Sequence, residues 1–96
     1  MAKIYLHTGS NIGDREQNLL SANLEIEKTI GTITSMSNIY ETAAWGLKDQ
    51  DDFLNQALEV NTVLEPHEVL DESQKIENQM GRIRYKKWGR RLIDID

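Results

Sequence analysis

Twelve residues near the middle of the chain, Phe53–Leu64, alternate between two kinds of side chain. One face would carry Leu54, Leu58, Val60, Thr62 and Leu64, and the other Phe53, Asn55, Ala57, Glu59 and Asn61. This period of two residues is typical of a β-strand with one buried and one more polar face. The chain is therefore expected to form a sheet that other elements cover on one side.

Two further strands are predicted before this one. Lys3–Thr8 alternates until Gly9-Ser10-Asn11 interrupts it, and Thr32–Tyr40 is rich in β-branched residues. Residues 41–52 are expected to form a loop, because they combine a glycine with a cluster of acidic residues.

Two helices are predicted between the strands. The first covers about residues 14–30, because Asp14 and Gln17 resemble a capping box and Gly31 stands at the usual C′ position. The second starts near Pro66 and ends at Gly81. Its buried side would carry Val69, Ser73, Ile76 and Met80.

The order of elements is then βαββαβ, in which Leu92–Asp96 forms the start of the last strand. This order predicts an α+β, ferredoxin-like fold with two helices on one face of an antiparallel sheet. Ninety-six residues suit one small domain, so residues 1–96 are expected to form a single domain. Its last strand would be truncated, because the sequence stops two or three residues into it.

Composition limits the classes of function. The chain has no cysteine, which excludes disulfides and thiolate metal sites. No apolar run approaches the ~18 residues of a membrane span, and the N-terminus lacks the apolar core of a secretory signal. We therefore expect a cytoplasmic protein without a membrane partner.

Charge is distributed unevenly along the chain. Residues 1–81 hold five basic and fourteen acidic side chains, whereas residues 82–96 hold six basic and two acidic ones. A net charge of −5 argues against nucleic acid as a partner. A cationic segment followed by two carboxylates suits a small phosphorylated ligand that arrives with its own metal ion.

Asp94-Ile95-Asp96 is the sharpest local signal. Residues two apart on a strand share a face, with Cα atoms roughly 7 Å apart. A cation would relieve the repulsion between the two carboxylates, and purely oxygen ligands favour Mg²⁺, as one ion or as two. Two solvated carboxylates at a chain end are the alternative interpretation.

The basic segment just before this pair contains six cations and an aromatic residue. They are Arg82, Arg84, Lys86, Lys87, Arg90 and Arg91, with Trp88 among them. An arginine can bind phosphate oxygens through two hydrogen bonds at once. Trp88 could stack on a nucleotide base. Gln74 and Glu77, one helical turn apart, could reach the same nucleotide, and the ordinary polarity of a helix surface explains them equally well. A solvated charge run and a core tryptophan remain the alternative.

The polar face of the middle strand offers a second surface. Phe53 and Asn55 combine a flat ring with an amide that both donates and accepts hydrogen bonds, which suits a planar heterocycle. An ordinary exposed strand face is the alternative. His7 and His67 have no matching acid or nucleophile, so both are regarded as structural.

These segments together resemble the 6-hydroxymethyl-7,8-dihydropterin pyrophosphokinase family of folate biosynthesis. The resemblance rests on Gly9-Ser10-Asn11, Tyr40-Glu41-Thr42 with Gly46, Asp49-Gln50-x-Asp52-Phe53-Leu54-Asn55, Gln74-x-x-Glu77, Gly81-Arg82-x-Arg84 and Trp88-Gly89-x-Arg91-x-x-Asp94-Ile95-Asp96. These motifs span nearly the whole chain in the order and spacing of the family, and the last is its signature.

The resemblance implies transfer of pyrophosphate from ATP to the hydroxymethyl group of the dihydropterin, with release of AMP. Asp94 and Asp96 would hold two Mg²⁺ ions, and Arg82 and Arg91 would complete the catalytic set. The ATP-binding residues would be Gln74, Glu77, Arg84, Trp88 and Arg91, and the pterin-binding residues Thr42, Ala43, Trp45, Phe53 and Asn55.

Two departures from the family pattern stand out. Arg90 occupies a position where the family usually has proline. Family members also continue past Asp96, so the chain is expected to lack their C-terminal part, to leave Asp96 frayed and to turn over poorly. Two alternatives remain: a truncated member that only binds nucleotide, and a ferredoxin-like module that binds RNA or another ligand. The incomplete edge strand also invites self-association.

Overall fold

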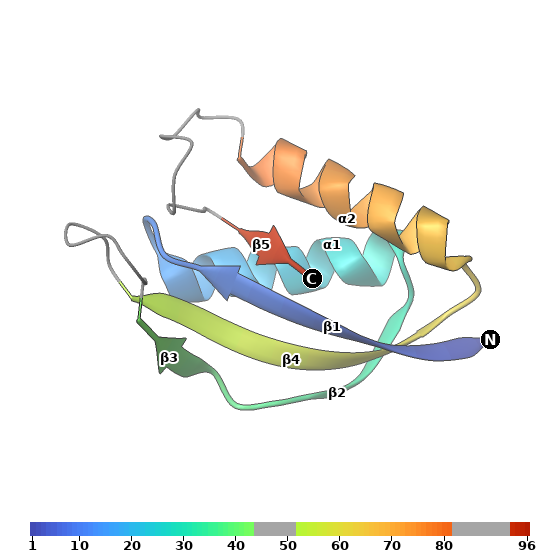
Figure 1. Ribbon diagram of the computed structural model, residues 1–96, viewed down its shortest axis with the longest axis horizontal. Coiled ribbons are helices and arrows are strands. Elements are labelled where there is room, and N and C mark those ends of the chain that lie inside the picture. The colour runs from blue at the N-terminus through green and yellow to red at the C-terminus, as the bar shows by residue number, and fades with distance from the viewer. Residues whose placement is uncertain (44–51, 82–92) are drawn as a thin grey trace.

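The computed structural model describes residues 1–43, 52–81 and 93–96 (Figure 1). Its elements are β1 (Ala2–Ser10), α1 (Arg15–Thr29), β2 (Thr32–Met36), β3 (Tyr40–Thr42), β4 (Phe53–Thr62), α2 (Pro66–Met80) and β5 (Asp94–Ile95). The sheet is antiparallel, with the order β2-β4-β1-β5, and β3 also pairs with β4. Both helices lie on the same side of it in Figure 1. The predicted α+β, ferredoxin-like arrangement is confirmed.

The core lies between the helices and one face of the sheet. Its buried residues are Leu6, Leu19, Ala22, Ile26, Ile30, Leu54, Leu58, Val60, Ile76, Ile93 and Ile95. The predicted alternation of β4 is confirmed, because Leu54, Leu58 and Val60 are buried under the helices. Gln56 shares this face and is 6% exposed. Its buried amide accepts from Asn23 Nδ2 at 3.1 Å and donates to the Ser37 carbonyl at 2.9 Å.

The predicted strand Thr32–Tyr40 is wrong in one respect, because it is two strands, β2 and β3. Between them, Ser37 binds Ala57 of β4 twice: its N–H donates to the Ala57 carbonyl, and its Oγ accepts from the Ala57 N–H, both at 2.9 Å. Met36 is paired with Leu58 but Tyr40 with Asn55, so this side of the ladder contains one extra residue. The serine side chain thus replaces a backbone partner where the ladder changes register.

Two other expectations about strand ends need correction. Gly9-Ser10 does not end the first strand, because Gly9 and Ser10 continue the pairing of β1 with β4. β4 ends at Thr62 rather than Leu64, and the Thr62 hydroxyl accepts a hydrogen bond from the Leu64 N–H at 3.0 Å. The same hydroxyl donates to the Ile30 carbonyl at 2.6 Å, which ties β4 to the end of α1.

The helices begin and end close to the predicted residues, but the reason for the glycine at position 31 differs from the predicted one. Asp14 caps α1 by accepting from the Gln17 N–H at 3.1 Å, and α2 begins at Pro66 and is capped by Gly81. Gly31 follows α1 as expected, but among the described residues only Gly13 has a positive φ, 67°. Gly31 is required instead by close packing, since a Cβ there would lie 2.0 Å from the Asn61 carbonyl oxygen.

In the part of the chain described, neither helix has the length and apolarity to cross a membrane.

Candidate ligand-binding site

A pocket of about 180 Å³ opens on the sheet at the end where β1, β3, β4 and β5 meet. It is lined by His7, Gly9, Thr42, Phe53, Asn55 and Asp96. These residues alternate with neighbours such as Thr8, Leu54 and Ile95 that are buried. The pocket therefore lies on the face of the sheet opposite the helices.

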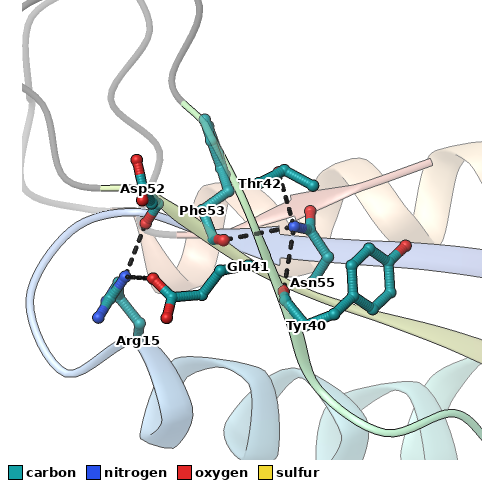
Figure 2. A network of polar contacts seen from close by, with 7 residues as sticks. All are labelled: Arg15, Tyr40, Glu41, Thr42, Asp52, Phe53 and Asn55. Atoms are coloured by element: carbon teal, nitrogen blue, oxygen red, sulfur yellow. Dashed lines mark hydrogen bonds and ion pairs between the residues drawn. The ribbon is translucent and has the colours of Figure 1, made fainter.

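Asn55 lines this pocket and is 6% exposed. Its Nδ2 donates to Thr42 Oγ1 at 2.8 Å and lies 3.3 and 3.4 Å from the carbonyl oxygens of Tyr40 and Phe53 (Figure 2). The amide hydrogens are thus committed to protein acceptors. None of the described residues donates a hydrogen bond to Asn55 Oδ1, so this oxygen offers an acceptor to a ligand.

Gly9 gives Asn55 and Phe53 room to lie across β1. A Cβ at position 9 would stand 3.1 Å from Asn55 Oδ1 and 3.4 Å from Phe53 Cδ1. The first distance is tighter than ordinary packing, and the second is at its limit. The glycine therefore keeps the amide oxygen and the edge of the ring accessible in the pocket.

Asp96 is held in the pocket by its own backbone. Its N–H donates to the His7 carbonyl and its carbonyl accepts from the His7 N–H, both at 2.8 Å. The expectation that Asp96 is frayed is wrong, because β5 pairs with β1 up to this residue. Asp94, two residues before Asp96, is paired with Gly9 of β1. Its backbone is described, but its side chain lies outside the described atoms.

Sequence reasoning missed His7, which was expected to be only structural. It lines the pocket, and its Nε2 is hydrogen-bonded to the Tyr40 hydroxyl, with ring centroids 5.9 Å apart. A signal was present, since His7 and Gly9 share a face of a strand by parity. What the sequence could not supply was the pairing of β1 with both β4 and β5.

The structure thus unites four of the predicted site residues, Thr42, Phe53, Asn55 and Asp96. Ala43 follows Thr42 at the end of β3 and is exposed. Gln74 is exposed on α2, whereas Glu77, one turn later, accepts from the Ile95 N–H at 2.8 Å. The remaining predicted residues, Trp45, Arg82, Arg84, Trp88 and Arg91, lie outside the described residues.

A family model and individual relatives of known name both match this chain, and they indicate the same family. The family model for 7,8-dihydro-6-hydroxymethylpterin-pyrophosphokinase matches residues 5–96. Three relatives are named 2-amino-4-hydroxy-6-hydroxymethyldihydropteridine pyrophosphokinase. That of Bacillus subtilis is 46% identical over 96% of this chain and 56% of its own length. That of Aquifex aeolicus is 44% identical over 100% and 59%, and that of Methylorubrum extorquens 43% over 100% and 61%.

The chain therefore spans a little over half the length of these relatives, and the matched part includes every described element from Tyr5 onward. The expected resemblance is confirmed, and the RNA-binding alternative is not favoured. On the family match and the identities with its relatives, the chain belongs to the 7,8-dihydro-6-hydroxymethylpterin-pyrophosphokinase family.

Proposed function

We propose that this chain transfers pyrophosphate from ATP to the hydroxymethyl group of 6-hydroxymethyl-7,8-dihydropterin and releases AMP. The observation that carries the proposal is the pocket that unites Thr42, Phe53 and Asn55 with Asp96. A planar-ring surface and a carboxylate expected to hold a metal thus lie side by side. The choice of a pterin as the substrate follows the names of the relatives, which are hydroxymethyldihydropteridine pyrophosphokinases.

The pterin would lie against Phe53 and donate a hydrogen bond from its amino or ring N–H edge to Asn55 Oδ1. Thr42, Ala43 and Trp45 would complete this side of the site. The volume of about 180 Å³ is below the ~300 Å³ typical of pockets for larger ligands, so it suits a ring rather than a whole nucleotide. The triphosphate would extend beyond the pocket, over Asp96.

Asp96 fits a Mg²⁺ site that the substrate helps to build. Among residues 1–43, 52–81 and 93–96, no group of three or more His, Cys, Asp or Glu side chains could hold a metal ion. Mg²⁺ usually takes one or two carboxylates and completes its shell with water and substrate phosphate oxygens. Asp94 and Asp96 would be those carboxylates, for two ions. When bound, Mg²⁺ would neutralise charge on the phosphate oxygens.

The remaining residues would position the nucleotide. Arg82 and Arg91 would hold the triphosphate, and the wider ATP site would comprise Gln74, Glu77, Arg84, Trp88 and Arg91. Glu77 would also keep β5 in place, as its hydrogen bond to Ile95 supports. With the pterin fixed at Asn55, its hydroxymethyl oxygen would form a bond to the β-phosphorus and lose its proton to solvent. The bond from that phosphorus to the oxygen shared with the α-phosphate would break, and AMP would leave.

Calorimetry tests the proposal directly. The 96-residue chain is titrated with 6-hydroxymethylpterin and with a non-hydrolysable ATP analogue, each with and without Mg²⁺, and AMP release is then measured with both substrates. We expect the pterin to bind, and Mg²⁺ to strengthen binding of the nucleotide. A folded chain that binds neither ligand would overturn the proposal.

The cytoplasm is the proposed location of the protein, because ATP is available in that compartment.

A further inference from the structure

We propose that Arg15, at the start of α1, is a positioning residue for the ligand pocket. It contacts Glu41 of β3 and the backbone of Asp52 just before β4, the sequence neighbours of the pocket residues Thr42 and Phe53 (Figure 2). The inference concerns how the pocket is held in shape. It rests on the proposed function only in naming the pterin as the ligand.

Arg15 makes two contacts, one with β3 and one with the residue that immediately precedes β4. Its Nη1 donates a hydrogen bond to the Asp52 carbonyl at 2.8 Å and lies 3.6 Å from Glu41 Oε2. The Arg15 side chain is 29% exposed and that of Glu41 59%. The Arg15 side chain is therefore partly buried, while its acidic partner is exposed to solvent. Figure 2 shows Arg15 reaching up from the first turn of α1 to both partners.

The register of the sheet links these contacts to the pocket. Thr42 is paired with Phe53 and Glu41 with Leu54, and Asp52 immediately precedes β4. Each partner of Arg15 is thus the sequence neighbour of a pocket residue. Because successive side chains of a strand face opposite sides, Arg15 contacts β3 through Glu41 on the side opposite Thr42 and the pocket. Its hydrogen bond to the Asp52 carbonyl holds the backbone just before Phe53.

β3 is the element that most needs such support. It is three residues long, and its described pairing is with β4 alone. Two of the acceptors that orient the Asn55 amide, Thr42 Oγ1 and the Tyr40 carbonyl, belong to β3. A shift of β3 would therefore release the Asn55 amide and turn its Oδ1 away from the ligand.

Arginine suits this task better than lysine. Both contacts come from Nη1, whose N–H groups are held in fixed directions by the planar guanidinium. A lysine at the same position would keep the charge but present an ammonium group on a flexible stem, whose donors are not held in these directions. The conservative variant should therefore recover only part of the effect.

The test compares Arg15→Gln and Arg15→Lys with Lys28→Gln as the matched control. Lys28 is also on α1, but its ion pair is with Glu25 of the same helix at 3.3 Å, away from the pocket. We expect Arg15→Gln to weaken 6-hydroxymethylpterin binding about tenfold, as loss of a hydrogen bond from a charged group would. Affinity for the Mg²⁺-bound ATP analogue should change less than about twofold, Arg15→Lys should lie between, and Lys28→Gln should match the wild type.

A second readout needs no ligand. NMR hydrogen exchange of the Asn55 side-chain amide should accelerate in Arg15→Gln but not in Lys28→Gln, whereas exchange at Val60 in the centre of the sheet should stay unchanged. Unaltered Asn55 exchange, or equal losses of affinity for both ligands, would overturn the positioning role. If the wild type binds no pterin and Asn55 exchange still responds to Arg15→Gln, the proposed function fails while the positioning role stands.

Discussion

The carboxylate of Glu77 accepts a hydrogen bond from the backbone N–H of Ile95, with 2.8 Å between Oε2 and the nitrogen. The bond joins α2 to β5 next to the buried side chains of Ile76 and Ile95. Ile95 stands between the two aspartates of the D-x-D motif. Glu77 thus helps to fix the backbone at the centre of this motif.

Glu77→Ala is expected to lower the free energy of unfolding by about 1–2 kcal/mol, because a hydrogen bond to a charged acceptor is lost. For a domain of this size each kcal/mol corresponds to a fall of roughly 4–8 °C in Tm, which thermal unfolding would detect. Glu72→Ala is the control, since Glu72 forms a surface ion pair with Lys75 on the same helix at 3.3 Å. Equal effects of the two variants would show that the bond to Ile95 contributes nothing specific.

Gly31→Ala is expected to destabilise the fold by about 3 kcal/mol or more, because the new Cβ would collide with backbone that cannot yield. Gly81→Ala provides the comparison. It also lies at a helix end, but its Cβ would come no closer than 3.0 Å to the Glu77 carbonyl. Its cost should stay below about 1 kcal/mol. Urea unfolding measures both, and a mild Gly31→Ala would contradict the close approach to Asn61.

Gly9→Ala is expected to weaken 6-hydroxymethylpterin binding about tenfold with little loss of stability, because its methyl group would displace Asn55 Oδ1. Calorimetry with the pterin, alongside urea unfolding, separates the two effects. Gly81→Ala should leave the affinity unchanged. Wild-type affinity in the Gly9 variant would remove Asn55 Oδ1 from the proposed contact with the pterin.

Asp96→Asn is expected to weaken Mg²⁺-dependent binding of the ATP analogue by about tenfold or more, because one of two carboxylates is lost. Pterin affinity should change much less. Asp71→Asn, an exposed change on α2, controls for the loss of a negative charge. Affinity for the nucleotide that is unchanged, with and without Mg²⁺, would exclude Asp96 from the metal site.

The pKa of Glu59 lies below its usual value, chiefly because the Thr34 hydroxyl donates to its carboxylate at 2.8 Å and further because Lys3 lies nearby. An acid with a lowered pKa stabilises the fold above its unfolded-state pKa, and the contribution is lost as pH falls through its folded-state pKa. Thr34→Val should raise the Glu59 pKa toward its usual value. NMR titration of the Glu59 carboxyl measures this, with Thr32→Val as the control from the same strand. A pKa left unchanged by Thr34→Val would assign the shift to Lys3 and Tyr5 instead.

Local patterns were sufficient for most of the fold. The alternation of β4, the cap at Asp14 and the start of α2 at Pro66 depend on residues close together in sequence, and the structure confirms all three. The break at Ser37 could not be predicted in this way. It depends on Ala57, twenty residues away, through pairing that no local pattern encodes.

The candidate site divides along the same line. Strand parity was enough to place Phe53 and Asn55 on one polar face, but the union of that face with Thr42, His7 and Asp96 required the pairing of four strands. Arg15 gave no local signal, because its partners come from β3 and the residue before β4. The roles proposed for individual residues came from the family resemblance, since parity alone does not distinguish a pterin from another flat ring.

The reciprocal bonds between the backbones of Asp96 and His7 have a consequence for ion binding. A carboxylate on a free chain must lose conformational entropy when it captures a cation, and this loss weakens the affinity. Here the sheet has already removed the backbone part of that freedom when the protein folded. Only rotation about the bonds of the side chain is left to be frozen by the ligand. The sheet thereby acts as a preorganised scaffold for the acid, and part of any metal affinity at Asp96 is determined by the stability of β5 pairing.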